Sequence, residues 1–151
     1  MIDLPPGLTD DAFDDRFERG TVIRTLVRFD DGTTAYKRLV VANTDCSDRS
    51  TDILHFLCTS KTDFYLGNRW VQNDCLMVSA ADAGDAFDRS IAIDLRRTFT
   101  IRKSDLKSRY LGGELDFLGS LPAAVIDDMN EKITQSRQLS QEQKRIILPL
   151  D

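Results

Sequence analysis

The sequence predicts a mainly β protein with helices in its C-terminal third, built as a small barrel or a curled antiparallel sheet. Three observations predict this class. Apolar and polar residues alternate along short segments between residues 21 and 103, as they do in half-buried strands. Turn-forming residues separate these segments roughly every ten residues, which is typical of small barrels. After residue 104 the apolar spacing becomes that of helices.

The composition is that of one globular domain covering residues 1–151, with 41% hydrophobic and 30% charged residues. We divide it into an acidic N-terminal helical extension (1–19), a β-barrel core (20–103) and a helical part (104–151). No apolar run approaches the length of a membrane span, and the acidic N-terminus lacks a signal peptide's apolar segment. Three cysteines without a CxxC spacing indicate reduced thiols. We therefore expect a cytoplasmic protein with no membrane partner.

The first expected element is a helix in "LTDDAFDDRFERG", capped by Thr9 and ended by Gly20. Six strands follow, joined by polar turns such as "DDGT" at 30–33. The alternation predicts a core that includes Ile23, Val27, Val40, Leu54, Phe56, Cys58, Ile91 and Ile93. The expected strands cover residues 21–29, 35–44, 52–60, 70–80, 90–95 and 98–103.

Helices are expected in the remaining chain. Ser104 is predicted to cap a helix that stops at Gly112, and "ELDFLG" (114–119) is predicted to be a short extended link. Ser120 with Pro122 opens a longer amphipathic helix. Ser140 and Gln143 form a capping-box pattern for a final helical turn.

The chemistry open to the chain is limited by the side chains it has. Its one histidine, His55, lies in the middle of an expected strand, and no nucleotide-binding, zinc or hydrolase motif occurs. We therefore expect no metal site and no cofactor. An enzyme with these residues would rely on Arg, Lys, Ser and Thr, a set that suits metal-independent phosphodiester chemistry because guanidinium groups stabilise phosphorane charge.

One basic segment departs from the overall charge. The formal net charge is −5, which argues mildly against nucleic-acid binding, yet residues 96–109 ("RRTFTIRKSDLKSR") hold six bases and one acid. Two interpretations are open. The segment either contacts a phosphate backbone or forms a solvated face that balances the acidic N-terminus.

A second polar feature follows the apolar run 53–58, which ends abruptly in Thr59, Ser60 and Lys61. Two hydroxyls and a cation at a strand end are either ordinary turn chemistry or the edge of a phosphate site.

Four segments, in this order, resemble MazF/PemK-like toxins over roughly residues 19–137. They are "RGTVIRTLVRFDDGTTAYKRLVVAN", "LHFLCTSK", "IDLRRTFTIRKSDL" and "AAVIDDMNEKI". The resemblance implies an SH3-like barrel that forms a homodimer. It also implies a metal-independent endoribonuclease, a hydrolase that cleaves single-stranded RNA as mRNA interferases do, within a type II toxin–antitoxin system and with a cognate antitoxin as partner.

The resemblance assigns catalysis to Arg38, early in the second strand, and to Thr59, at the end of the third. Leu39 stands where the family usually has proline, and the segment "LRRTFTIRK" is two residues longer than the family spacing, so the choice between Arg96 and Arg97 stays open. The alternative is a non-catalytic MazF/CcdB-like barrel that binds a protein, such as a gyrase-type target, or serves assembly. The expected RNA-binding residues are Lys37, Ser60, Lys61, Arg96, Arg97, Arg102 and Lys103.

Overall fold

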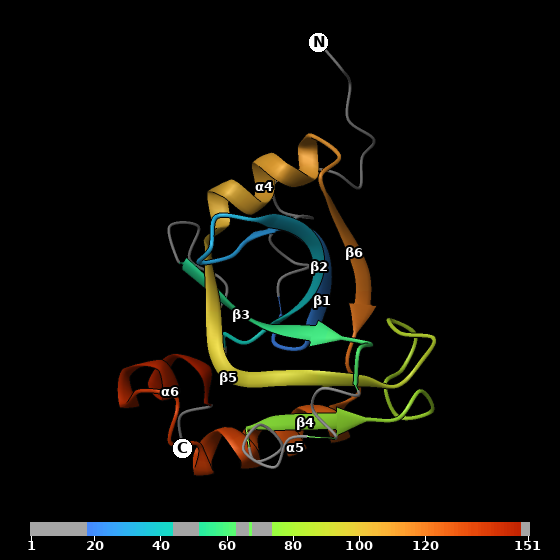
Figure 1. The fold of residues 1–151 in the computed structure, drawn as a ribbon, viewed down its shortest axis with the longest axis vertical. Helices are drawn as coiled ribbons and strands as arrows, with labels where there is room; N and C mark the ends of the chain where they lie inside the picture. The colour runs from blue at the N-terminus through green and yellow to red at the C-terminus, as the bar shows by residue number, and fades with distance from the viewer. Residues whose placement is uncertain (1–17, 44–51, 63–66, 68–73, 149–151) are drawn as a thin grey trace.

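A computed structural model describes residues 18–43, 52–62, 67 and 74–148, which form an antiparallel sheet and helices in the C-terminal third of the chain (Figure 1). The expected N-terminal helix falls mainly on residues 1–17, outside the described part. The described helices are α4 (Lys103–Leu111), α5 (Ala123–Gln135) and α6 (Gln141–Ile147). The described strands are β1 (Thr21–Arg28), β2 (Thr34–Val41), β3 (Asp52–Thr59), β4 (Cys75–Val78), β5 (Ile91–Arg102) and β6 (Leu115–Ser120).

The six described strands pair antiparallel in the order β4-β5-β3-β2-β1-β6, which confirms the predicted antiparallel class. β1 and β2 form a hairpin whose turn is the predicted "DDGT". Asp31 Oδ1 accepts hydrogen bonds from the Thr33 amide at 2.9 Å and the Thr33 hydroxyl at 2.6 Å. Gly32 has a φ of 85°, which glycine adopts without strain.

The expected closure into a barrel or curled sheet is wrong. β4 and β6 lie at opposite edges of the hydrogen-bonded order, and no described strand joins them. The helix α4 stands between β5 and β6 along the chain (Figure 1), and its Leu106 is buried with Leu115 of β6. The helix α4 therefore packs against β5 and β6.

β5 is one bent strand, although the sequence predicts two strands over this region. Its pairing with β3 shifts, because Asp94 opposes Leu57 while Phe99 opposes His55. Four residues of β5 (95–98) therefore face one residue of β3, and such an excess bends a strand (Figure 1). The sixth strand is β6, which lies in the segment predicted to be a link and pairs with β1.

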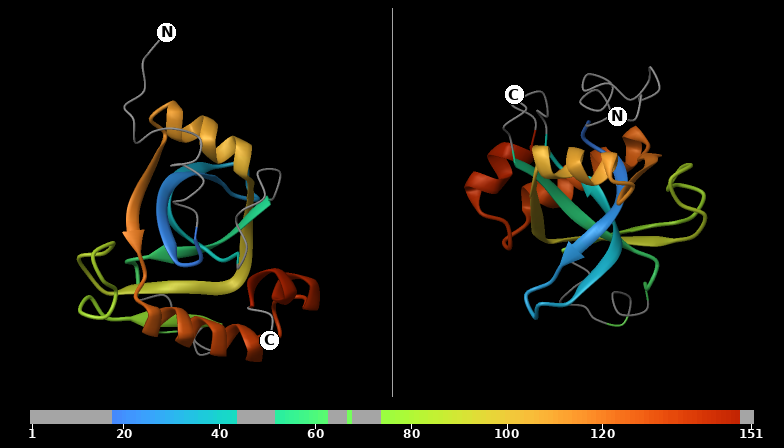
Figure 2. Two further views of the ribbon diagram at one scale, coloured as in Figure 1. Left: turned by 180° about the vertical axis from the view of Figure 1, so that it is seen from behind. Right: turned by 90° about the horizontal axis from the view of Figure 1, so that it is seen from above.

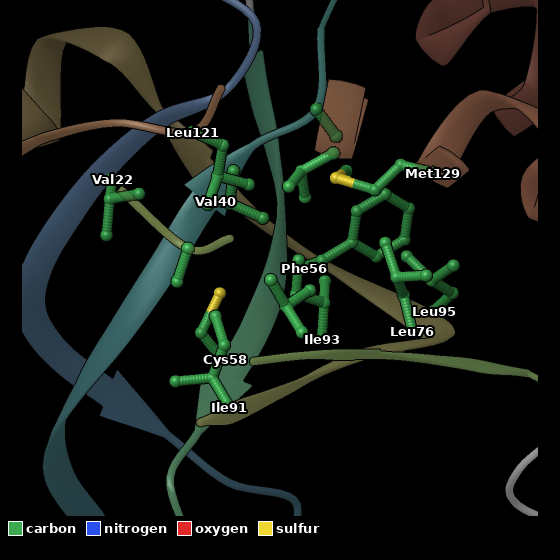
Figure 3. Packing of buried hydrophobic residues seen from close by; sticks show 14 of the residues in the cluster. Val22, Val40, Phe56, Cys58, Leu76, Ile91, Ile93, Leu95, Leu121 and Met129 are labelled. Carbon is green, nitrogen blue, oxygen red and sulfur yellow. The ribbon is translucent and has the colours of Figure 1, made fainter. Parts of the chain in front are cut away.

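The sheet is buried on two faces. The α5 face packs against the helices α5 and α6, as shown in part in Figure 3. The α4 face packs against α4. All eight predicted core residues are buried, which confirms the period-2 prediction. The core on the α5 face consists of sheet residues packed against Met129 of α5, and includes Val22, Val40, Phe56, Cys58, Leu76 and Ile93. The core on the α4 face consists of sheet residues packed against Leu106 of α4, and includes Ile23, Val27, Leu39, Val41, Ile53 and Leu115.

The predicted N-terminal cap is confirmed for the helix α6 but is wrong for the helix α4. Ser140 and Gln143 form the predicted capping box of α6. Ser104 does not cap α4, because the N-cap of this helix is Arg102, two residues earlier; the helix begins at Lys103 and has no side-chain cap. Among the described helices, none has the length and apolar character needed to cross a bilayer.

His55 is fully buried on the α4 face. Its Nδ1 lies 3.2 Å from the carbonyl oxygen of Phe99, and its Nε2 has no hydrogen-bond partner among the described residues. Burial lowers the pKa of His55 to about 4 from 6.5, and the positive charge of Arg109 acts in the same direction. The imidazole is therefore neutral in the folded protein at pH 7.

We predict that His55 makes the protein acid-sensitive. A histidine with a lowered folded-state pKa contributes stability that is complete above 6.5 and is lost as pH falls from 6.5 toward 4. The free energy of unfolding should drop by about 2 kcal/mol between pH 7 and pH 5, measured by urea titration at each pH. Since His55 is the chain's single histidine, His55→Leu should remove this slope. An equal slope in that variant would contradict the assignment.

Candidate nucleic-acid interface

Arg38 lies within β2, opposite Arg24 of β1 and opposite Cys58 of β3. Its side chain is half-buried, and its guanidinium carbon lies 5.6 Å from the ring centroid of Phe87. Arg38 makes no ion pair with any described residue. The residue that the resemblance makes central is therefore a partly exposed cation held over an aromatic ring, with no described carboxylate to neutralise it.

Thr59 is the last residue of β3, next to the residue that opposes Arg38. Its Oγ1 accepts a hydrogen bond from the backbone N–H of Lys61 at 3.1 Å, which stabilises the turn after the strand. The hydroxyl proton of Thr59 has no acceptor among the described residues. Thr59 therefore has both a turn role and a donor that a ligand can use.

Strand alternation separates Arg38 from Thr59. Arg38 shares the α5 face with Cys58, since the two residues are directly paired. Thr59, one residue further on, points to the α4 face, and Lys37 does the same from β2. Ser60 lies one residue beyond the end of β3, outside the alternation of the strand. Arg38, within β2, thus lies beside the end of β3, but Arg38 and Thr59 are divided between two faces.

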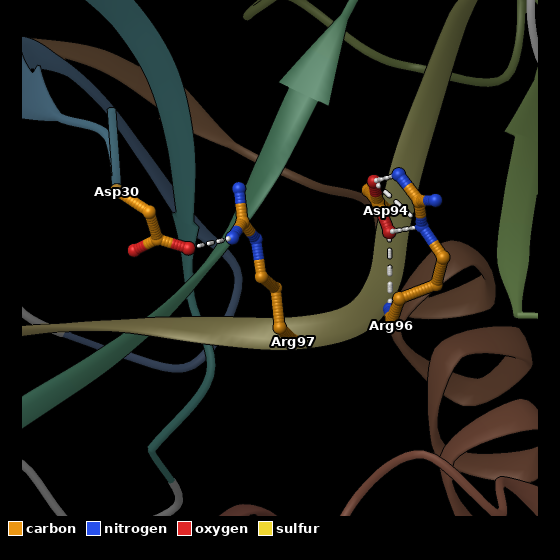
Figure 4. A network of polar contacts seen from close by, with 4 residues as sticks. All are labelled: Asp30, Asp94, Arg96 and Arg97. Carbon is orange, nitrogen blue, oxygen red and sulfur yellow. Dashed lines mark hydrogen bonds and ion pairs between the residues drawn. The ribbon is translucent and has the colours of Figure 1, made fainter. Parts of the chain in front are cut away.

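The basic residues of β5 are held by acids within the fold. Arg96 binds Asp94 through both carboxylate oxygens, at 2.9 Å from Nε to Oδ1 and 2.6 Å from Nη2 to Oδ2 (Figure 4). Arg97 binds Asp30 at 3.0 Å, so the two arginines form separate pairs (Figure 4). Each arginine is paired with an acid that lies outside residues 96–109, so the count of charges in that segment did not include it.

The rest of this basic segment is also engaged. Arg102 lies 4.0 Å from Asp52, and Lys103 is only 2% exposed. Arg109 donates to the carbonyl oxygen of Leu26 at 2.8 Å. Alternation also places Arg97 with Phe99 on the α4 face and Arg102 on the other. The structure therefore does not gather the predicted residues 96–103 on one surface with Arg38. Because Arg97 is paired with Asp30 on the α4 face, we leave it out of the RNA-binding residues that we propose below.

A different surface gathers cations and an aromatic ring. We call it the arginine–tyrosine face, and it consists of Arg24, Arg28, Tyr36 and Arg38. These residues share the α5 face of the β1–β2 hairpin, on the half that leads to the turn, and the turn projects away from the helices (Figure 2). Tyr36 is 46% exposed, and the Arg24 guanidinium carbon lies 4.6 Å from its ring centroid.

The sequence contained part of the signal for this face. Arg24 and Arg28 alternate with the apolar residues of the first strand, and Tyr36 and Arg38 are two residues apart in the second. What the sequence lacked was the register that sets Arg24 opposite Arg38 and brings Arg24 to the Tyr36 ring.

The electrostatics of this face favour an anion. Like charges directly opposite each other on antiparallel strands are destabilising, and Arg24 and Arg38 form such a pair. Asp116 on β6 lies 4.0 Å from Arg24 and neutralises it in part, with 64% of the Asp116 side chain exposed. Neither Arg28 nor Arg38 has an ion-pair partner in the part of the chain that the structure describes.

Cys58, directly below Arg38, is not an activated nucleophile. Burial raises the pKa of the Cys58 thiol to about 12, although the positive charge of Arg38 acts to lower it. The thiol therefore stays protonated at neutral pH. Within the described residues, no three His, Cys, Asp or Glu side chains come together in a cluster that would hold a metal ion.

No family model and no curated protein matches this sequence.

We predict unequal costs for removing the two neighbouring arginines of β5. Arg96→Ala should lower the free energy of unfolding by about 2 kcal/mol, because it leaves the nearly buried Asp94 carboxylate without its cation. Arg97→Ala should cost less than about 1 kcal/mol, since its partner Asp30 is 96% exposed. Urea denaturation of both variants measures the difference. Equal losses would show that burial of the carboxylate does not set the cost.

Proposed function

We propose that the protein binds single-stranded RNA and cleaves it without a metal ion, as its resemblance to MazF/PemK-like toxins implies. One observation carries this proposal. Arg38 is a partly exposed guanidinium with no ion pair in the described part of the chain, one strand away from the hydroxyl-bearing end of β3. A fork of guanidinium donors fits the oxygens of a phosphodiester.

The proposed reaction is an in-line transesterification. The ribose 2′-oxygen attacks phosphorus, the bond to the 5′-oxygen breaks, and the products are a 2′,3′-cyclic phosphate and a 5′-hydroxyl. Water takes the proton from the 2′-hydroxyl and supplies one to the leaving oxygen. Arg38 stabilises the charge that develops on the phosphorane, because its planar set of guanidinium donors binds the phosphate oxygens as they gain charge.

A hydroxyl at the end of β3 supplies a second donor to the phosphate. The family resemblance assigns this role to Thr59, whose proton has no acceptor among the described residues. Ser60, the next residue along the chain, is the alternative donor at this end of β3. Lys37 and Lys61 stand beside these residues in sequence, and in this proposal they attract the RNA backbone without taking part in bond cleavage.

The second candidate function is non-catalytic, through binding a protein of the gyrase type or through assembly. The separation of Arg38 and Thr59 onto two faces favours it, because a cleavage site needs its groups to converge. The ion pairs of Arg96, Arg97 and Arg102 favour it as well, since these residues already have partners.

We expect the purified protein to cleave a long RNA in the presence of EDTA. Arg38→Ala should slow cleavage by roughly 10²–10³-fold, the usual cost of losing a transition-state charge donor. Gel electrophoresis of end-labelled RNA gives the rates and the ends of the products. Arg97→Ala is the control, because it removes an arginine that is engaged with Asp30 on the other face.

The hydroxyl variants decide which residue donates. If Thr59 is the donor, Thr59→Ala slows cleavage and Thr59→Ser does not, whereas a loss confined to Ser60→Ala assigns the role to Ser60. Wild-type protein that leaves RNA intact, or an Arg38→Ala variant with the wild-type rate, would overturn the catalytic proposal in favour of the binding one.

We further propose a homodimer, with a cognate antitoxin as the natural partner, again from the family resemblance. Light scattering at micromolar concentration should give about twice the 17.1 kDa mass of one chain. A species of 17.1 kDa at all concentrations tested would contradict the dimer.

A further inference from the structure

We infer that the arginine–tyrosine face is a stacking platform for single-stranded RNA, in which Tyr36 receives one base and Arg24, Arg28 and Arg38 contact the flanking phosphates. This inference takes its substrate class from the proposed function. It assigns binding to Arg24, Arg28 and Tyr36 beside the proposed catalytic Arg38, on a surface that needs no cleavage to be tested.

The geometry of Tyr36 is that of a ring presented for contact. Nearly half of the residue is exposed, on a strand surface where large apolar groups are normally covered. Arg24 lies 4.6 Å from the ring centroid and covers one side of the ring. Leu26 is paired with Tyr36, and the pair of Arg28 and Thr34 follows on the same face, nearer the turn. A base stacked there would lie between the tyrosine ring and the Arg28 side chain.

The charges identify the other part of the ligand. Arg24 and Arg38 are directly opposed across β1 and β2, and an anion bridging them relieves their repulsion. Arg28 lies roughly 13 Å from Arg24 along the same strand, at about 3.3 Å per residue. Cations spaced on either side of a ring match a chain of phosphates with a base between them. An acidic peptide would satisfy the arginines but would leave the Tyr36 ring without a stacking partner.

The fold offers a matched control on its other face. Arg97 lies 5.1 Å above the ring of Phe99 and binds Asp30, just as Arg24 lies over Tyr36 and near Asp116. The two arginines are similarly exposed, at 54% and 46% of their side chains. Only Arg24 is opposed by a second arginine.

The test is fluorescence anisotropy with a labelled 12-nucleotide oligouridine carrying 2′-O-methyl groups, titrated with the full-length protein. This RNA has no 2′-hydroxyl nucleophile, so binding is measured without cleavage. Tyr36→Ala should weaken binding roughly tenfold, the usual effect of losing one base–aromatic stack. Tyr36→Phe keeps the ring and should stay within about twofold of wild type.

Arg24→Ala should flatten the slope of log affinity against log salt by about one, because one phosphate contact is lost. Arg97→Ala should leave both affinity and slope unchanged. An oligomer with abasic sites should bind wild type about as weakly as the normal oligomer binds Tyr36→Ala. Circular dichroism of each variant confirms that the exposed substitutions preserve the fold.

Four results would overturn the platform. These are the absence of RNA binding, wild-type affinity in Tyr36→Ala, equal losses in Arg24→Ala and Arg97→Ala, and competition by polyglutamate as strong as by RNA. Binding that follows the expected pattern while natural RNA remains uncleaved would refute the nuclease and leave the platform intact. The two proposals therefore fail separately.

Discussion

The burial of β3 on both of its faces is the constraint on which the rest of the structure depends. Ile53 and Phe56, which point to opposite sides of the strand, are both fully buried. Each such side chain contributes about 1.5–3 kcal/mol only if something covers it. The helix α4 covers one face, and α5 with α6 cover the other. The polar side chains proposed to contact RNA therefore lie at the end of β3 and on the part of the β1–β2 hairpin that no helix covers.

Much of this arrangement could be predicted from the sequence, because its cause is local. Alternation fixed which residues of β1, β2 and β3 are buried, and Ser140 with Gln143 correctly marked the start of α6. The bend of β5 was missed, since two adjacent arginines interrupt the alternation and resemble a loop. There the backbone finds a partner elsewhere, with Leu95 donating to the carbonyl oxygen of Asp74 at 2.9 Å. β6 was missed because its pairing partner, β1, is distant in sequence.

The candidate site was less predictable, because it depends on register and on long-range pairing. Arg38 and Thr59 could be selected by their positions on strands, but only the pairing of Arg38 with Cys58 shows that they face opposite sides. The count of bases in residues 96–109 likewise suggested a cationic surface. Asp30, which pairs with Arg97, is 67 residues away in sequence, so a count within a window could not include it. Conversely, Arg24 and Tyr36 belong to no catalytic or binding motif, and only the pairing of β1 with β2 shows that they are in contact.

The opposition of Arg24 and Arg38 also gives ionic strength two contrary effects on the same hairpin. Dissolved salt screens the repulsion between exposed like charges, so the hairpin folds more favourably as salt rises. The same salt weakens any phosphate contact made by these arginines, because counterions released on binding gain less entropy when they enter a more concentrated solution. A polyanion bound to the face would replace salt as the source of screening, and it would do so most effectively in dilute buffer. Folding of the hairpin and occupancy of its surface are therefore thermodynamically coupled through this one pair of side chains.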